Sequence, residues 1–310
     1  MIPLERPETP PSPLSTVPFT QNPEFISRDN LLDQIHEKAS APGSMVALFG
    51  LGGVGKSQLA IEYSYRVRSQ SPSTWVFWIH ASNAARFEES FRDIADRIRL
   101  PGRHDPNGNI LRLVQNWLLD GRTSKWVLIV DNVDDDGFLR KLSATDREGQ
   151  RNGRANASPR PLLEFLPQSS NGSILFTTRS KELALKLVDY RNLIEIEPMK
   201  RFEALRLLQK KLELREESEA SVKLVEQLEF MPLAIVQAAS YIKHRAPRCS
   251  VSQYLKKLQK GDSEAIKLLN DKAGDHCREW GKRTPLWLHG RYLLTIFDEQ
   301  DGPQQTYSLS

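Results

Sequence analysis

Cysteine is scarce in this chain, and its scarcity sets the first limits on the kind of protein. The 310 residues include two cysteines, Cys249 and Cys277, which are too few for a disulfide framework. The six histidines are scattered without metal-ligand spacing, so we predict no metal site built from histidine and cysteine. The thiols are expected to be reduced, which favours a cytoplasmic protein.

Long apolar runs, a strong net charge and internal repeats are also missing. No run approaches 18 apolar residues, and prolines and acids stand where a signal peptide needs a basic segment, so we expect no membrane partner. With 43 basic and 39 acidic residues the formal net charge is +4, which is too small to argue for nucleic acid as a partner. No period of 34 or 40 residues exists, which excludes a repeat architecture.

One octapeptide carries most of the chemical information in the sequence. The residues from Gly50 to Ser57 read GLGGVGKS, which satisfies the G-x-x-x-x-G-K-[ST] pattern of a phosphate-binding loop. Glycines allow successive backbone N–H groups to turn toward phosphates, and the helix that follows directs its positive dipole end at them. The motif predicts a nucleoside triphosphate site in which Lys56 reaches the β and γ phosphates and Ser57 binds Mg²⁺.

Around this loop, apolar runs alternate with helical patterns. Continuous apolar runs are typical of parallel strands that are covered on both faces, whereas Phe87, Phe91 and Ile94 recur at helical spacing. We expect strands over 45–50, 74–80, 125–130, 173–177 and 193–196, and helices over 57–68, 84–100, 109–120, 181–188, 201–214, 217–229, 232–244 and 250–260. The pattern predicts an α/β fold, a five-stranded parallel P-loop NTPase sheet with helices on both faces, followed by a small all-α domain.

The same pattern divides the chain into segments. Seven prolines within residues 1–24 predict a disordered N-terminal segment. A nucleotide-binding domain is expected over 25–198, with a mobile polar insertion at 134–160, and a helical domain over 199–262. Residues 263–310 are expected to form an irregular tail.

Two further apolar strands end in polar residues that suit a phosphate site. The strand Trp126–Val130 leads into Asp131, where a carboxylate would hold Mg²⁺ through a bound water. The strand Ser173–Phe176 leads through two threonines into Arg179, which would contact the γ phosphate. A structural alternative for each is a solvated polar residue at a strand end. Lys56, Asp131 and Arg179 are the predicted catalytic residues, and Ser57 with Asp131 the predicted Mg²⁺ site.

Together these residues resemble the NB-ARC module of the STAND class of signalling P-loop NTPases. The resemblance rests on the loop Gly50–Ser57, on Asp131 after its strand, on Thr177-Thr178-Arg179, and on Met231-Pro232-Leu233-Ala234 between helices. Phe25-Ile26-Ser27-Arg28 is similar to the family's adenine-side motif. The chain is most similar to fungal NLR-like proteins, and it resembles one truncated before the winged-helix and repeat regions.

The resemblance implies an AAA+/ASCE-like nucleotide domain that works as a switch. ADP would be held in the resting state, and exchange for ATP would let the protein assemble with itself or with other proteins. Pro232 would line the nucleotide, although the same proline also suits the first turn of a helix. The predicted nucleotide-binding residues are Arg28, Gly50, Gly52, Gly53, Val54, Gly55, Lys56, Ser57, Gln58 and Pro232.

One departure from the family pattern bears on hydrolysis. Asn132 stands where many relatives carry a second acid, and an amide cannot act as a general base. Asp134 and Asp135 would substitute only if their loop folds back. We therefore expect binding of ATP and ADP with slow or assembly-dependent hydrolysis. The alternatives are a turnover P-loop ATPase or kinase, and a truncated nucleotide-binding fragment that acts only through longer relatives.

Overall fold

The structure is a computed structural model, and it divides the chain into two compact units. It describes residues 11–28, 30–106, 108–120, 124–135, 137, 161–260, 268, 286–288 and 291–293. The first unit comprises Met1–Leu51 and Gly55–Glu197, and the second comprises Gly52–Val54 and Pro198–Ser310.

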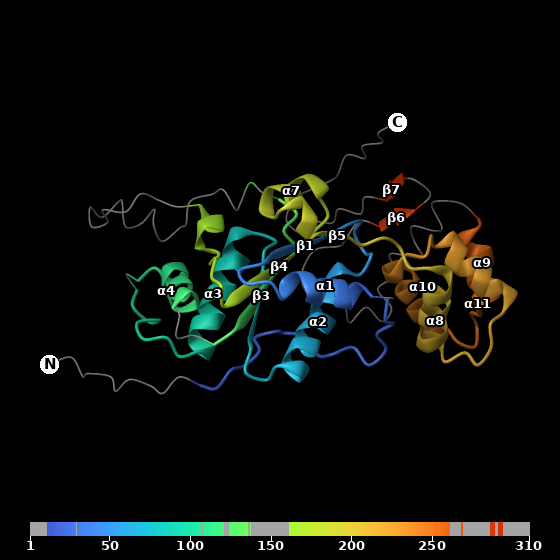
Figure 1. Cartoon of the computed structure of the whole chain (residues 1–310). Coiled ribbons are helices and arrows are strands. Elements are labelled where there is room, and N and C mark those ends of the chain that lie inside the picture. Colours follow the sequence, from blue (N-terminus) through green and yellow to red (C-terminus); the bar gives the residue numbers. More distant parts are fainter. Residues whose placement is uncertain are drawn as a thin grey trace, which may run out of the picture. The chain divides into compact units, whose positions relative to one another are not determined.

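The first unit is built on a five-stranded parallel sheet (Figure 1). Its strands are β1 (Met45–Phe49), β2 (Trp75–His80), β3 (Trp126–Asp131), β4 (Gly172–Thr178) and β5 (Leu193–Glu195). They lie in the order β2-β3-β4-β1-β5, with every neighbouring pair parallel. The predicted five-stranded parallel sheet is confirmed, and each strand lies within two residues of its expected bounds.

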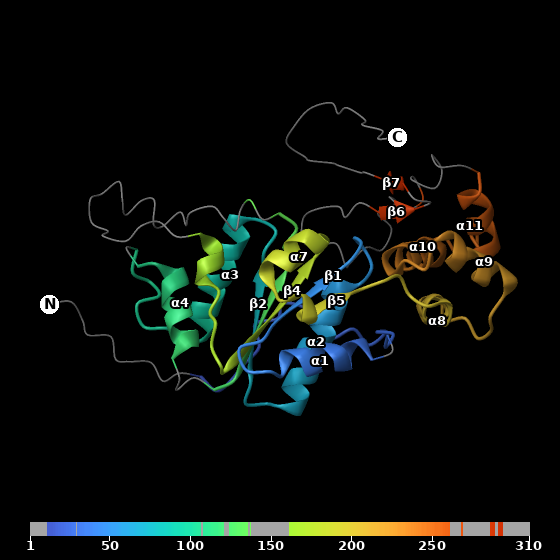
Figure 2. The same ribbon diagram turned by 45° about the horizontal axis from the view of Figure 1, so that its top comes forward.

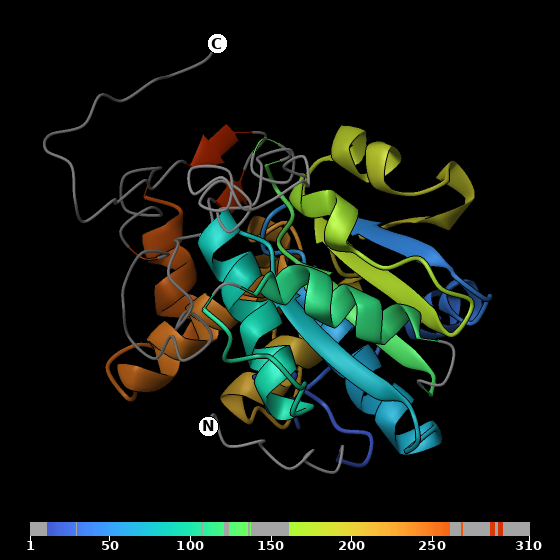
Figure 3. The same cartoon turned by 90° about the vertical axis from the view of Figure 1, so that its left-hand side faces the viewer.

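Helices cover both faces of this sheet (Figures 2 and 3). The helices of this unit are α1 (Leu31–Ala39), α2 (Lys56–Gln70), α3 (Ala84–Arg97), α4 (Ile110–Leu119) and α7 (Lys181–Leu187), with the 3-10 turns η1 (Leu162–Phe165) and η2 (Tyr190–Asn192). Alternate strand residues such as Phe77, Leu128 and Phe176 share one buried cluster with residues of α3, α4 and α7. Helices α1 and α2 lie on the opposite face of the sheet (Figure 2).

Local sequence explains where several of these helices begin. Asn83, Asn109 and Ser180 immediately precede α3, α4 and α7, and each side chain accepts a hydrogen bond from a backbone N–H of the first helical turn. Helix α1 was not among the predicted helices. Its buried residues Ile35 and Ala39 lie four positions apart, so they lie on one face of the helix, as the apolar residues of the predicted helices do.

Part of the proline-rich segment that was predicted to be disordered, residues 11–24, has defined contacts on the first unit. Ser15 bridges in parallel to Val76, and the Thr16 N–H donates to the Val76 carbonyl at 2.9 Å. The Thr16 hydroxyl accepts from the Trp78 N–H at 2.9 Å. Because β2 is an edge strand, this segment occupies donors and acceptors that an edge otherwise leaves open.

The second unit contains four helices among its described residues. They are α8 (Arg201–Leu212), α9 (Glu219–Gln227), α10 (Pro232–His244) and α11 (Val251–Leu258), close to the expected bounds. Two short antiparallel strands, β6 (Leu286–Leu288) and β7 (Arg291–Leu293), also belong to it. The four helices lie within the expected helical domain, and both strands lie in the segment 263–310 that was expected to be irregular.

Several predictions fall outside the described residues. The proposed insertion at 134–160 is described only at residues 134, 135 and 137, and most of 263–310 is likewise outside them. In the parts of the chain that are described, no helix combines the length and hydropathy that a membrane span requires.

Candidate functional site

Glycine shapes the loop that leaves β1. Gly50 has φ +147°, and a Cβ atom built on it would lie 2.3 Å from the Ile196 carbonyl oxygen. Since β5 runs beside β1, no larger residue fits where the loop leaves the sheet. Gly55 has φ +100° and directly precedes α2, in the left-handed region that favours glycine. The motif residues therefore form the strand-loop-helix arrangement that a phosphate loop requires.

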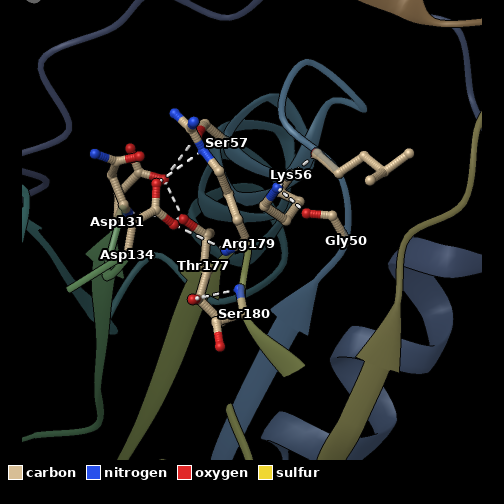
Figure 4. Close-up of polar contacts among 11 residues, drawn as sticks. Gly50, Lys56, Ser57, Asp131, Asp134, Thr177, Arg179 and Ser180 are labelled. Carbon is tan, nitrogen blue, oxygen red and sulfur yellow. Dashed lines mark hydrogen bonds and ion pairs between the residues drawn. The ribbon is translucent and has the colours of Figure 1, made fainter. Parts of the chain in front are cut away.

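Lys56 is the first residue of α2, and its side chain folds back over the loop. Its Nζ donates hydrogen bonds to the Gly50 and Leu51 carbonyl oxygens, each at 2.8 Å (Figure 4). The residue is 8% exposed, and burial lowers the pKa of its ammonium group to about 8. Because burial destabilises the charged form of Lys56, a bound anion would stabilise its ammonium group.

Asp131 lies at the end of β3, and two hydroxyl groups hold it. Its Oδ1 accepts hydrogen bonds from Ser57 Oγ at 2.7 Å and from Thr177 Oγ1 at 2.6 Å (Figure 4). Burial raises the pKa of this carboxyl group, while the hydrogen bonds from Thr177 and Ser57 oppose the shift. The structure thus brings together Ser57 and Asp131, which are 74 positions apart in the sequence.

Arg179 follows β4 by one residue and pairs with Asp134. The Arg179 N–H donates to Asp134 Oδ1 and its Nε to Asp134 Oδ2, both at 2.8 Å. The chain turns just after β3, because Asn132 adopts φ +64°. Asparagine is one of the few residues that tolerate this left-handed conformation. The acid that was expected to matter only if its loop folded back therefore lies beside Arg179.

The remaining predicted binding residues lie in different places. Arg28 is buried and donates a hydrogen bond to the Glu197 carbonyl, and its Nη1 lies 3.9 Å from a Cβ atom built on Gly55. Gln58 is exposed on the first turn of α2. Pro232 is the first residue of α10 in the second unit, the helical position where no N–H is needed. The contacts of Arg28, Gln58 and Pro232 with a nucleotide stay predictions, as do those of Gly52, Gly53 and Val54.

Two residues of this site were not assigned a role from the sequence. Thr177 was noted only as part of a motif, yet its hydroxyl also accepts from the Asn132 N–H at 2.9 Å and so joins β3 to β4. Asp134 was considered as a base, and its pairing with Arg179 was missed. An acid follows the apolar strand β3 and a base follows the apolar strand β4. This pattern would have suggested the pair if the two strands had been known to be neighbours.

The oxygen donors of Ser57 and Asp131 are of the type that Mg²⁺ prefers, a hydroxyl and a carboxylate at the end of a strand. Among the described residues, no group of three or more histidine, cysteine, aspartate or glutamate side chains is arranged to hold a metal without help. A Mg²⁺ ion here would need further ligands from water or phosphate, which is how this ion commonly binds beside nucleotides.

Comparison with known proteins agrees with this geometry. The family model of the NB-ARC domain matches residues 27–155. The chain carries an NB-ARC domain. This domain contains the phosphate loop, Ser57 and Asp131, and it relates the chain to the nucleotide-binding P-loop NTPases.

Relatives extend the similarity beyond this domain. The chain is 33% identical over 296 residues to a nucleotide-binding leucine-rich repeat (NLR)-like protein of Hyaloscypha variabilis, covering 92% of this chain and 29% of that protein. It is 26% identical over 327 residues to the regulatory protein AfsR of Streptomyces griseus, covering 96% of this chain and 30% of that protein. The chain thus spans less than a third of the length of either relative.

A solved structure supports the fold. The Walker-type ATPase of Pyrococcus abyssi superimposes with a TM-score of 0.55 at 14% identity, over 80% of this chain and 75% of that one. At this identity the likeness concerns the fold alone.

Proposed function

We propose that this chain is an ATP- and ADP-binding switch of the STAND type, whose bound nucleotide controls assembly with itself or with other proteins. The nucleotide phosphates bind to the loop from Gly50 to Ser57, and the bound nucleotide decides which partners the chain engages. Hydrolysis is slow or needs assembly, so the reaction serves as a timer. The expectation of reduced thiols favours action inside the cell.

The observation that carries this proposal is the convergence of Lys56, Ser57 and Asp131. Lys56 is held over the loop by two hydrogen bonds, and Ser57 Oγ lies 2.7 Å from Asp131 Oδ1. An ammonium group, a hydroxyl and a carboxylate at the start of one helix form a site for phosphate with Mg²⁺. Ser57 and Asp131 would hold the ion, which when bound neutralises charge on the phosphates.

Slow hydrolysis is proposed because neither Asn132 nor the carboxylates of Asp131 and Asp134 are available as a base. Asn132 offers only an amide, and Asp134 is occupied by Arg179 through two hydrogen bonds. Asp131 already accepts two hydrogen bonds and is the proposed metal carboxylate. The site thus has an ammonium group, a hydroxyl and a carboxylate for binding a nucleotide with Mg²⁺. Activation of a water molecule would require one of the engaged carboxylates to move.

The test is to identify the nucleotide that copurifies with the full chain, by acid extraction and chromatography, and then to add Mg²⁺-ATP. We expect near-stoichiometric ADP that exchanges slowly and releases little phosphate. Lys56→Ala should weaken ADP binding by at least about tenfold, because it removes a charged partner of the phosphates. The exposed Lys125 provides the matched control, and Lys125→Ala should leave ADP affinity unchanged.

Other outcomes would replace the proposal. Rapid phosphate release over many turnovers would favour a P-loop ATPase or kinase. A protein that binds no nucleotide alone, but gains binding when mixed with a longer relative, would favour the fragment. Full ADP affinity in Lys56→Ala would contradict the phosphate-loop assignment itself.

A further inference from the structure

Asp134 and Arg179 form an ion pair next to the phosphate loop. Among the described residues of this site, it is the one pair of opposite charges in which neither member belongs to the loop or to the proposed Mg²⁺ site. One carboxylate binds Arg179 twice, through the backbone N–H and through Nε, each at 2.8 Å (Figure 4). The two side chains are 35% and 26% exposed, so water only partly screens the pair. Asp134 therefore holds both the backbone and the guanidinium group of Arg179.

The backbone builds this pairing. Beyond β3, the Asn132 N–H donates to Thr177 Oγ1 at 2.9 Å and the Val133 N–H donates to the Thr177 carbonyl at 2.9 Å. The Asp134 N–H then donates to the Asn132 carbonyl at 3.1 Å. These bonds connect the chain after β3 to the end of β4, and Arg179 is the residue that follows β4. Backbone hydrogen bonds thus fix the position of Asp134 beside Arg179. An incidental ion pair between surface side chains would not require these bonds.

The pair also lies beside the proposed phosphate site. Asp134 and Arg179 both act electrostatically on the Lys56 ammonium, with opposite signs. Thr177, which contacts Asp131, belongs to the same strand end as Arg179. A guanidinium group at this edge is within the electrostatic reach of the group that is proposed to bind the β and γ phosphates.

A carboxylate and a terminal phosphate would compete for the same guanidinium group. We propose that Asp134 is a specificity-determining residue which favours nucleoside diphosphate over triphosphate, because it holds Arg179 and so withholds it from a γ phosphate. This inference rests on the proposed function, since it assumes that nucleotide phosphates bind beside Lys56. ADP does not need Arg179 and leaves the pair intact, whereas ATP gains Arg179 only when the pair breaks.

The neighbouring acid supplies a matched control. Asp135 has the same charge and adjoins Asp134, but its Oδ1 accepts from the Gly137 N–H at 2.7 Å. Asp134→Asn and Asp135→Asn therefore make the same change in net charge, and only the first weakens the hold on Arg179.

The experiment measures the affinities of the full chain for ADP and for a non-hydrolysable ATP analogue by isothermal titration calorimetry with Mg²⁺. Asp134→Asn should raise the affinity ratio of analogue to ADP about three- to tenfold, the range expected for a partly exposed charged pair. Asp135→Asn should change this ratio less than twofold. Asp134→Ala provides a second variant if the asparagine protein does not fold.

A double-mutant cycle then tests the route through Arg179. In an Arg179→Ala background, Asp134→Asn should no longer raise the ratio, because there is no guanidinium group to release. An equal rise in both backgrounds would overturn the inference, and so would equal effects of Asp134→Asn and Asp135→Asn. If these results occur while Lys56→Ala weakens ADP binding as expected, the proposed function stands and only the role of Asp134 fails.

Discussion

The two sides of the proposed nucleotide site are held together by different kinds of contact. On the β1 side, Lys56 bonds to backbone carbonyls of its own loop, six and five positions earlier in the sequence. On the β3 and β4 side, Asp131 bonds to hydroxyl groups 74 and 46 positions away. One side is therefore a local backbone structure, and the other exists only when the sheet has formed.

This difference separates what a short motif specifies from what the fold specifies. Glycine conformations and the close approach of Gly50 to Ile196 shape the exit from β1, so this part of the loop depends mainly on eight consecutive residues. The carboxylates depend on the adjacency of β3 and β4 in the sheet. Changes to the loop should thus alter backbone geometry, whereas changes across β3 and β4 should alter individual hydrogen bonds.

The largest effect is expected from Gly50→Ala. The new Cβ atom would lie 2.3 Å from the Ile196 carbonyl oxygen, at a φ of +147°, so the loop or the segment just after β5 must move. We expect a loss of about 3 kcal/mol or more in the free energy of unfolding, measured by denaturant titration, together with loss of ADP binding.

Gly102→Ala is the control for this change. Gly102 also has a positive φ, +82°, but nothing lies within 4 Å of its added Cβ atom. The cost should be about 1 kcal/mol, from backbone strain alone, with unchanged ADP affinity. Equal losses in the two variants would show that conformation, and not the contact with Ile196, limits position 50.

A smaller effect is expected on the other side of the site, from Thr177→Val. Thr177 is 1% exposed, and its hydroxyl donates to Asp131 and accepts from the Asn132 N–H. The valine would leave both groups short of a partner, at a cost of about 2 kcal/mol in the free energy of unfolding. The dependence of ADP affinity on Mg²⁺ should also weaken, because Asp131 loses one of the groups that orient it.

Thr178→Val separates these two consequences. Thr178 is fully buried on the same strand, but its hydroxyl accepts from the Ser180 N–H at 3.1 Å and does not contact Asp131. This variant should lose about 1 kcal/mol of stability and keep the Mg²⁺ dependence of ADP binding. The same loss of Mg²⁺ dependence in both variants would contradict the role given to Thr177.

The sequence predicted the local features of this site and missed those that depend on the order of the strands. The strands and the loop were predicted closely, because buried parallel strands are continuous apolar runs and the loop is a contiguous motif. The Asp134–Arg179 pair was missed, since it requires the strand order β2-β3-β4-β1-β5, which no local pattern contains. Composition likewise predicted disorder for a proline-rich segment in which Thr16 pairs with β2; this strand was predicted, but its place at the edge of the sheet was not.

The smallest effect is expected for the stability of Asp134→Asn. The Asp134–Arg179 pair is partly exposed, and such pairs contribute little to folding, so the free energy of unfolding should fall by less than about 1 kcal/mol. The asparagine oxygen still accepts a hydrogen bond from the Arg179 N–H, which preserves the end of β4. Denaturant titration of Asp134→Asn beside Thr177→Val measures both on one scale. A loss as large as that of Thr177→Val would mean that Asp134 is part of the fold's support, and the pair would then be too strong for a γ phosphate to open.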